Sequence, residues 1–314
     1  MLYFALLFGS HFVSRLAIAG SFVALIALAH RANSQPATTS RVRELSPGVY
    51  FWQGDRATHT QTNVGWVVFD DFVFVIDANF PWGARDIVNE IRKTTGKPIR
   101  FVFDTHYHAD HAYGNVVFAE LGAAILSSAA CAEESRRKGL RDVENQAKGS
   151  KEPLVHPAIG FEQRLVIDDG RRRVELTHVG PAHTRGDAVA WLPAEKILFV
   201  GDLAVNWTLG NNVSDVDADH ENWVQALDRL SQWDASIVVP GHGVLGTRET
   251  LVGQRGYLAA MLSEVRAGIR DRKSADQVAG DINLTRFQPF GADPKRTASQ
   301  ARSMYRRLAS NAQR

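Results

Sequence analysis

Short apolar runs and segments with helical spacing alternate along the chain from about residue 48 onward. Runs rich in β-branched and aromatic residues predict strands at 48–53, 63–69, 72–77, 99–104, 124–126, 161–167, 173–179, 196–200 and 236–240. Apolar positions three and four residues apart predict helices at 83–94, 115–121, 129–137, 219–233, 248–272 and 295–309. Two polar stretches, 139–158 and 273–294, predict a surface insertion and an irregular segment. Strands that alternate with helices favour an α/β fold.

A dense group of metal-capable side chains follows the predicted strand 99–104. His106, His108, Asp110 and His111 fall within six positions. In an extended chain His106 and His108 point to the same side, and a turn after His108 would bring the other two toward the same cavity. Because α/β sheets place ligands at the carboxyl ends of their strands, and because imidazole and carboxylate are ligands that zinc prefers, this stretch predicts a metal site.

Three further candidate ligands lie at or just beyond the ends of later predicted strands. His183 lies in the loop 180–187, Asp202 follows Gly201, and His242 follows Gly241. A glycine at such a position permits a sharp turn and a close approach of the backbone. Together with the first group these side chains make seven donors, enough for two metal ions that share one bridging carboxylate.

The order HxHxDH, then GPAHTRGD, then GD, then PGHG, resembles the metallo-β-lactamase superfamily from about residue 48 to about residue 242. The resemblance implies a four-layer αβ/βα sandwich, an α/β fold with the metals in a groove along one sheet edge. It also implies a role for each donor: the first metal would be held by His106, His108 and His183, the second by Asp110, His111 and His242, and Asp202 would bridge them. Asp110 would in addition orient the attacking water. Seven His/Asp donors are closest to the hydroxyacylglutathione hydrolase-like members with two metals.

The chemistry expected of such a centre is hydrolysis. Two Zn²⁺ ions per chain would lower the pKa of a shared water, which would then attack an ester, thioester, lactone or lactam bond in a small molecule. Iron or manganese are alternative metals, and an iron-containing relative of the persulfide dioxygenases or a β-lactamase are alternative functions. The chain lacks the metal-binding cysteine of some β-lactamases, because Asp202 stands there and the only cysteine is Cys131. A purely structural zinc site, closed by four ligands, is disfavoured by the larger donor set.

Several residues near the expected groove are candidates for substrate contact. Trp207, Asn206 and Asn211 lie in the loop that leaves Asp202, and His59 lies in the predicted flap 54–63. An ordinary loop, and an uncommitted exposed histidine, are the alternatives. Asp77 ends a strand near the same rim, where it would either orient a ligand histidine or form a turn.

The N-terminal segment 1–34 is interpreted as a signal peptide. Fourteen uncharged residues, 16–29, follow Arg15, which matches a signal core and is short for a membrane span. Cleavage is expected between Ala29 and Gln35, followed by a linker at 35–47 and the metallo-β-lactamase domain with C-terminal helices at 48–314. The protein would then be periplasmic or secreted, without stable membrane association. An uncleaved membrane anchor is the alternative.

The charge balance bears on possible partners. The chain contains 36 basic and 34 acidic residues, and residues 1–34 contain two arginines and no acid. The remainder after residue 34 is therefore neutral, which argues against broad electrostatic binding of nucleic acid. A small-molecule substrate is the expected partner, and the oligomeric state is left open.

Overall fold

The computed structural model describes residues 41–146, 149–207, 210–215 and 217–311. The predicted signal peptide lies outside these residues. Within the described ranges, no helix combines the length and the apolar character that a bilayer crossing needs.

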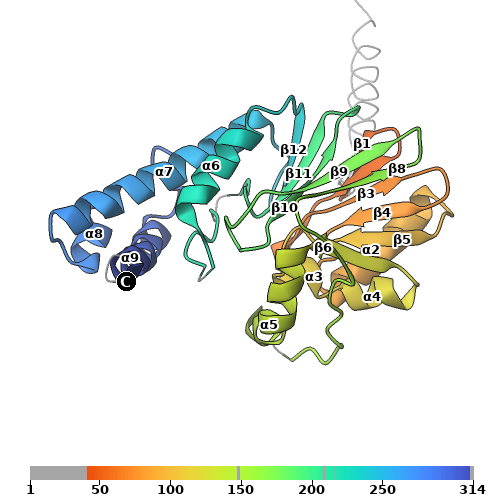
Figure 1. The fold of residues 1–314 in the computed structure, drawn as a ribbon, viewed down its shortest axis with the longest axis horizontal. Coiled ribbons are helices and arrows are strands. Elements are labelled where there is room, and N and C mark those ends of the chain that lie inside the picture. Colours follow the sequence, from red (N-terminus) through yellow and green to blue (C-terminus); the bar gives the residue numbers. More distant parts are fainter. Residues whose placement is uncertain (1–40, 147–148, 208–209, 216, 312–314) are drawn as a thin grey trace, which may run out of the picture. The chain divides into compact units, whose positions relative to one another are not determined.

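Two β-sheets form the centre of the fold (Figure 1). The first has seven strands, paired in chain order: β1 (Val42–Ser46), β2 (Val49–Trp52), β3 (Val64–Val68), β4 (Val73–Ile76), β5 (Ile99–Phe103), β6 (Ala124–Ser128) and β7 (Ile159–Phe161). Pairing is antiparallel from β1 to β4 and parallel from β4 to β7. The second has five strands, in the order β12 (Ile237–Pro240), β11 (Ile197–Gly201), β10 (Ala188–Leu192), β9 (Arg173–His178) and β8 (Arg164–Asp168).

Helices connect and cover these strands. They are the 3₁₀ turn η1 (Arg56–Thr58), α2 (Pro81–Thr94), α3 (Ala109–Ala112), α4 (Asn115–Glu120), α5 (Ala129–Gln146), α6 (His220–Leu230), α7 (Arg248–Arg270), α8 (Ala275–Asp281) and α9 (Pro294–Asn311). Helix α2 begins with Pro81, whose fixed φ suits the first turn, and buries Ala84, Ile87, Val88 and Ile91. This stripe of buried residues confirms the helical spacing read from the sequence.

Three apolar layers hold the sheets and helices together. The buried face of α2 packs with Trp66, Val75 and Val102 of the first sheet. Phe51, Phe74 and Phe103, on the other side of that sheet, pack against the second sheet. A third cluster joins the far side of the second sheet to α6 and α7. The order helix, sheet, sheet, helix confirms the four-layer α/β sandwich (Figure 1).

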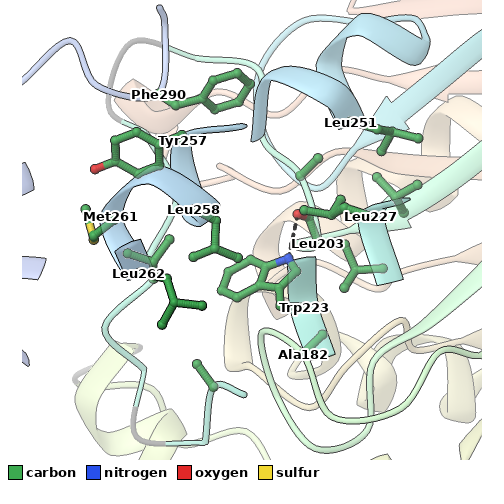
Figure 2. Close-up of a cluster of buried hydrophobic side chains, with 14 of the residues drawn as sticks. Ala182, Leu203, Trp223, Leu227, Leu251, Tyr257, Leu258, Met261, Leu262 and Phe290 are labelled. Carbon is green, nitrogen blue, oxygen red and sulfur yellow. Dashed lines mark hydrogen bonds between the residues drawn. The ribbon is translucent and has the colours of Figure 1, made fainter. Parts of the chain in front are cut away.

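Trp223 of α6 is central to the third cluster. Figure 2 shows its indole among Leu203, Leu227, Leu258 and Leu262. The buried indole N–H donates to the carbonyl of Leu203 at 2.9 Å. This bond ties α6 to the segment directly after Asp202 and so helps to fix the loop that leaves the candidate metal site.

Several features differ from the sequence-based expectations. Strand β1 covers Val42–Ser46, within the segment that was expected to be a linker. Helix α5 extends to Gln146, so the first part of the expected insertion is helical; Gly139 does not break it, and its missing side chain leaves room for Leu154. Helix α8 lies in the stretch expected to be irregular. The expected strand 161–167 is divided between β7 and β8, which belong to different sheets.

Candidate metal centre

The HxHxDH stretch lies at the carboxyl end of β5. The chain leaves the strand at Phe103 and begins the short helix α3 directly after His108, which has an extended backbone. This turn carries Asp110 and His111 back toward the two preceding histidines, as the sequence predicted. All seven predicted donors are buried: His106, His108, Asp110, His111, His183, Asp202 and His242.

Three histidines form the first group of potential ligands. The Nδ1 atom of His108 lies 3.1 Å from Nε2 of His106 and 3.2 Å from Nε2 of His183. One ligand atom from each ring therefore faces a common point. His183 reaches this point from the loop between β9 and β10, far away in the sequence.

Asp110, His111 and His242 form the second group. Nε2 of His242 lies 3.4 Å from Nε2 of His111 and 3.3 Å from Oδ2 of Asp110. The same carboxylate oxygen of Asp110 accepts a hydrogen bond from the hydroxyl of Thr62 at 3.1 Å. The loop between β2 and β3 thus contributes to the position of this candidate ligand.

Asp202 lies between the two groups. Its Oδ1 atom is 3.3 Å from Nε2 of His111 and 3.2 Å from Nε2 of His242. Its Oδ2 atom is 3.7 Å from Nε2 of His183. The two oxygens of one carboxylate therefore face different groups, which is the placement that a bridging ligand needs.

The outer ring nitrogens of three histidines have partners of their own. Nε2 of His108 lies 3.1 Å from a carboxylate oxygen of Asp215, and Nδ1 of His111 lies 2.9 Å from one of Asp77. Nδ1 of His242 lies 2.9 Å from the carbonyl oxygen of Gln61. A proton on each outer nitrogen would satisfy these contacts, and the inner nitrogen of a neutral ring would then present its lone pair to the centre.

In this tautomer the inner nitrogens, 3.1–3.4 Å apart, present lone pairs to one another with no hydrogen between them. Such an arrangement is unfavourable unless a cation occupies the space between the nitrogens. Imidazole nitrogens and carboxylate oxygens are ligands for Zn²⁺ and for similar transition metals. The residues present therefore fit a metal centre.

Burial and neighbouring charges shift the pKa values of these histidines in opposite directions. Burial lowers the pKa of His183 to about 4 and that of His106 well below its usual value. Burial also opposes charge on His108, but the hydrogen bond to Asp215 and the nearby carboxylates raise its pKa to about 9. For His111, the carboxylates of Asp77 and Asp202 outweigh burial and raise the pKa. The carboxylates around His108 and His111 thus favour a positive charge in the centre. A bound cation supplies this charge in place of protons.

Asp77 serves both of the purposes considered from the sequence. Its carboxylate accepts hydrogen bonds from the backbone N–H and the hydroxyl of Thr105, at 2.8 and 3.0 Å, as well as from His111. Its backbone is also in the left-handed region, with φ 62°, as a turn requires. The same residue turns the chain and orients a candidate ligand.

Two glycines allow the close packing expected around Asp202. Gly201 has φ +52°, and a side chain there would also collide with Thr105. At Gly241 an added Cβ atom would lie 2.0 Å from Oδ1 of Asp202. The neighbouring ends of β11 and β12 can approach each other only because this position carries no side chain.

Comparison with known proteins agrees with this geometry. A family model described as the metallo-beta-lactamase superfamily matches residues 57–242, more than half of the chain. The chain belongs to this superfamily. The resemblance read from the HxHxDH and later motifs is therefore confirmed.

Known superfamily members include several enzymes. A metallo-beta-lactamase type 2 from Bacillus cereus is 28% identical over 171 residues, which are 54% of this chain and 61% of the relative. A linear primary-alkylsulfatase from Pseudomonas sp. (strain ATCC 19151) is 24% identical over 197 residues, 51% of this chain and 37% of the relative. The chain thus spans less than two thirds of the length of these curated relatives.

Solved structures share the fold. A metallo-beta-lactamase from Pontibacter korlensis has a TM-score of 0.58 and 24% identity, and covers 69% of this chain and 98% of its own. A stereoselective inverting sec-alkylsulfatase from Pseudomonas sp. has a TM-score of 0.68 and 16% identity, and covers 85% of this chain and 50% of its own.

In this superfamily member the metal centre opens into a cavity of about 340 Å³. Of the predicted substrate contacts, Trp207 and Asn211 line it, as does the neighbouring Asn212. The ring of Trp207 stacks on His242, with centroids 4.5 Å apart. Asn206 does not line the cavity, because its amide donates to the carbonyl of Leu245.

His59 also lies outside this lining. It is exposed, it ends the 3₁₀ turn η1 in the left-handed conformation, and its carbonyl accepts from the indole of Trp82 at 2.8 Å. The alternative interpretation of an exposed loop histidine fits these observations.

Sequence analysis missed four polar or charged residues that line the cavity: Asp215, Gln61, Arg56 and Arg296. Asp215 carried a weak signal, since it lies in the segment that follows the candidate substrate loop. Arg296 carried none, because its helix is separated from the last motif by more than fifty residues.

Other polar residues near the centre are bonded within the protein. The carboxylate of Asp187 accepts from the N–H and the hydroxyl of Thr184, at 2.7 and 2.8 Å, and these bonds fix the loop around His183. Cys131 is fully buried, and burial raises the pKa of its thiol. His178 and His220 bond to backbone carbonyls.

Proposed function

We propose that this chain is a hydrolase with two Zn²⁺ ions that cleaves an ester, thioester, lactone or lactam bond in a small molecule. The observation that carries the proposal is the position of Asp202, whose two oxygens face two separate groups of ligand atoms. A single structural metal would need only four ligands and no open cavity. Seven donors beside a cavity of about 340 Å³ suit a reactive centre.

In the proposed enzyme His106, His108 and His183 hold one ion, Asp110, His111 and His242 hold the other, and Asp202 is shared. Two bound Zn²⁺ ions supply a water of lowered pKa and Lewis acidity toward the bond that is cleaved.

Neighbouring side chains position Asp110 and shape the cavity beside the centre. Thr62 donates to one oxygen of Asp110 at 3.1 Å, which leaves the carboxylate fixed where it lines the cavity. Asp110 is therefore placed to orient a water and to accept its proton. The ring of Trp207, stacked on His242, gives the substrate an apolar surface.

The names of relatives widen the range of bonds worth testing. Curated relatives include lactamases and an alkylsulfatase. A sulfate ester therefore joins the ester, thioester, lactone, lactam and phosphodiester substrates in a screen.

Elemental analysis of the purified protein, followed by this screen, tests the proposal. About two zinc ions per chain and turnover of at least one acyl substrate that is lost with a chelator are expected. Manganese, or one iron per chain without zinc, would contradict the zinc assignment. One iron per chain would also favour a dioxygenase-like reaction. Two zinc ions without turnover of any substrate would contradict the hydrolase.

We propose further that the protein is exported, on the basis of the uncharged segment 16–29. N-terminal sequencing of protein from its native host is expected to show cleavage between Ala29 and Gln35. An intact segment recovered in membrane fractions would instead support an anchor. The proposed partner is a small molecule and not a nucleic acid, because residues 35–314 are balanced in formal charge.

A further inference from the structure

Two arginines line the cavity that contains the candidate metal ligands. Arg56 comes from η1, in the loop between β2 and β3, and is exposed. Arg296 comes from the first turn of α9 and is half-buried. Arg296 lies beyond residue 242, where the match to the superfamily model ends. The motifs that define the family therefore do not account for it.

Hydrogen bonds connect α9 to the loop that leaves Asp202. The side-chain amide of Gln300 donates to the carbonyl of Asn211, and the amide of Asn211 donates to the carbonyl of Asp202 at 2.7 Å. The hydroxyl of Tyr257, on α7, donates to the oxygen of the same Gln300 amide at 2.8 Å. Arg296 is four residues before Gln300, one helical turn away. Its place in the cavity is thus set by the same bonds that hold Asp202.

The side chain of Arg296 lacks a partner of its own within the described residues. Its Nε atom is buried without a hydrogen bond. No carboxylate among these residues lies within ion-pair distance of Arg296 or of Arg56. Arg302, on the same helix, differs, because it pairs with Asp276. A buried cationic donor that is left unpaired is costly, and a ligand that completes its hydrogen bonds would remove that cost.

Carboxylates line other parts of the same cavity, but histidines already engage them. Asp110, Asp202 and Asp215 each lie within 3.3 Å of a ring nitrogen. Among the arginine and lysine side chains that line this cavity, the two guanidinium groups are therefore the positive charges without an ion-pair partner.

We propose that Arg296, assisted by Arg56, binds an anionic oxyacid group of the substrate. A guanidinium presents N–H donors in a planar fork that matches the oxygens of a carboxylate, sulfate or phosphate. The substrate of the proposed hydrolase then carries a negative charge in addition to the bond that is cleaved, and in this respect the inference rests on the proposed function.

A binding series tests the inference without any bond cleavage. Calorimetric titration of the zinc-loaded protein uses hexanoate, hexane-1-sulfonate and hexylphosphonate, with hexan-1-ol as the neutral equivalent. At least one anion is expected to bind more tightly than the alcohol, and Arg296→Gln is expected to weaken that anion tenfold or more. The anion that suffers the largest loss identifies the preferred acid group.

Arg302→Gln is the matched control, since it removes the same charge from the same helix outside the cavity. It should leave every affinity unchanged within about twofold. Arg56→Gln should weaken the same anion by a smaller factor, because its exposed guanidinium remains hydrated. Should Arg296→Gln fail to fold, Arg56→Gln and Arg296→Lys, which keeps the charge and loses the planar fork, provide the same comparison.

A pair of esters extends the test to turnover. With 4-nitrophenyl hexanoate and the mono-4-nitrophenyl ester of adipic acid, Arg296→Gln should lower kcat/KM tenfold or more for the adipate ester alone, mainly through KM. Equal losses on both esters, or anion affinities that Arg296→Gln and Arg302→Gln change alike, would overturn the inference while the hydrolase stands. Selective loss of anion binding in a protein that hydrolyses no substrate would overturn the hydrolase and leave the anion site.

Discussion

At the scale of single residues, Asp202 is the proposed bridge between the two groups of candidate metal ligands. Its carboxylate is the group whose oxygens face both sets of histidines, at 3.2–3.3 Å on one side and 3.7 Å on the other. Two cations held a few ångströms apart repel each other, and a shared anion offsets that repulsion.

Asp202→Asn should therefore lower the metal content from about two ions toward one per chain and reduce turnover by about 100-fold or more. The amide keeps the size of the side chain and removes its charge. Metal content by elemental analysis and kcat on one substrate are the measurements, with circular dichroism to show that the variant is folded. Asp187→Asn is the matched control, because Asp187 bonds to Thr184 and is not in either ligand group. Two metals and unchanged turnover in Asp202→Asn would rule out a bridging role.

Asp215 contacts a candidate metal ligand and is not itself in either ligand group. It is hydrogen bonded to the outer nitrogen of His108 at 3.1 Å, and no sequence motif pointed to it. Partners of this kind fix the ring and its tautomer, and their loss commonly reduces metal affinity about 10- to 100-fold. Asp215→Asn should show a loss of this size when Zn²⁺ is titrated in competition with a chelator. Asp217→Asn, whose carboxylate binds Tyr107 and Lys138, should change the affinity much less.

At the scale of elements, the packing of α6 against α7 supports the loop that leaves Asp202 through Trp223 (Figure 2). Trp223→Phe removes the N–H that binds the carbonyl of Leu203 and leaves a small cavity in a fully buried cluster. The free energy of unfolding, measured in urea, should fall by about 2–4 kcal/mol.

The metal content of Trp223→Phe should be retained, because none of the ligand side chains is altered. Trp191→Phe is the comparison: Trp191 is half-buried, and its indole nitrogen has no hydrogen-bond partner among the described residues. A loss of stability in Trp191→Phe as large as that in Trp223→Phe would show that the bond to Leu203 contributes little.

The elements that were predictable from sequence are those whose signal is local. Helix α2 and strand β5 followed from apolar spacing, and His106 to His111 were grouped because they are neighbours in the chain. Strand β10 (Ala188–Leu192) was not identified, because its short run directly follows the ligand loop and resembles a continuation of it. Helix α5 was cut short because its last turns are polar and include Gly139.

Residues whose role depends on tertiary packing could not be found in this way. Asp215 approaches His108 only after the loop beyond β11 has folded back, and Arg296 reaches the cavity because α9 packs in the third cluster and is bonded to Asn211. Conversely Asn206 had the right chemistry in the right loop, and a hydrogen bond to Leu245 turns it away. Sequence spacing identifies the donors, but packing decides which polar groups face the cavity.

At the scale of the whole molecule, metal binding and folding should be coupled. The centre joins side chains from both sheets, since His106 follows β5 and His242 follows β12. A ligand bound to the native state alone stabilises it by about 2.7 kcal/mol at a 100-fold excess over Kd. Removal of the metal with a chelator should therefore lower the Tm by about 5–10 °C, and Zn²⁺ should restore it. An unchanged Tm would show that the empty centre is already as stable as the loaded one.

The hydrogen bonds from Gln300 to Asn211 and from Asn211 to Asp202 join α9 to a candidate metal ligand, and the first turn of α9 contributes to neither bond. The candidate metal ligands lie between residues 57 and 242, whereas the cavity wall supplied by α9 is encoded beyond them. A mutational library restricted to the first turn of α9 would change which substrates bind and leave every candidate metal ligand unaltered. Relatives that share the motifs and differ in the terminal helix are natural variants of such a library. Grouping them by the sequence of that helix should group them by the substrates that they bind.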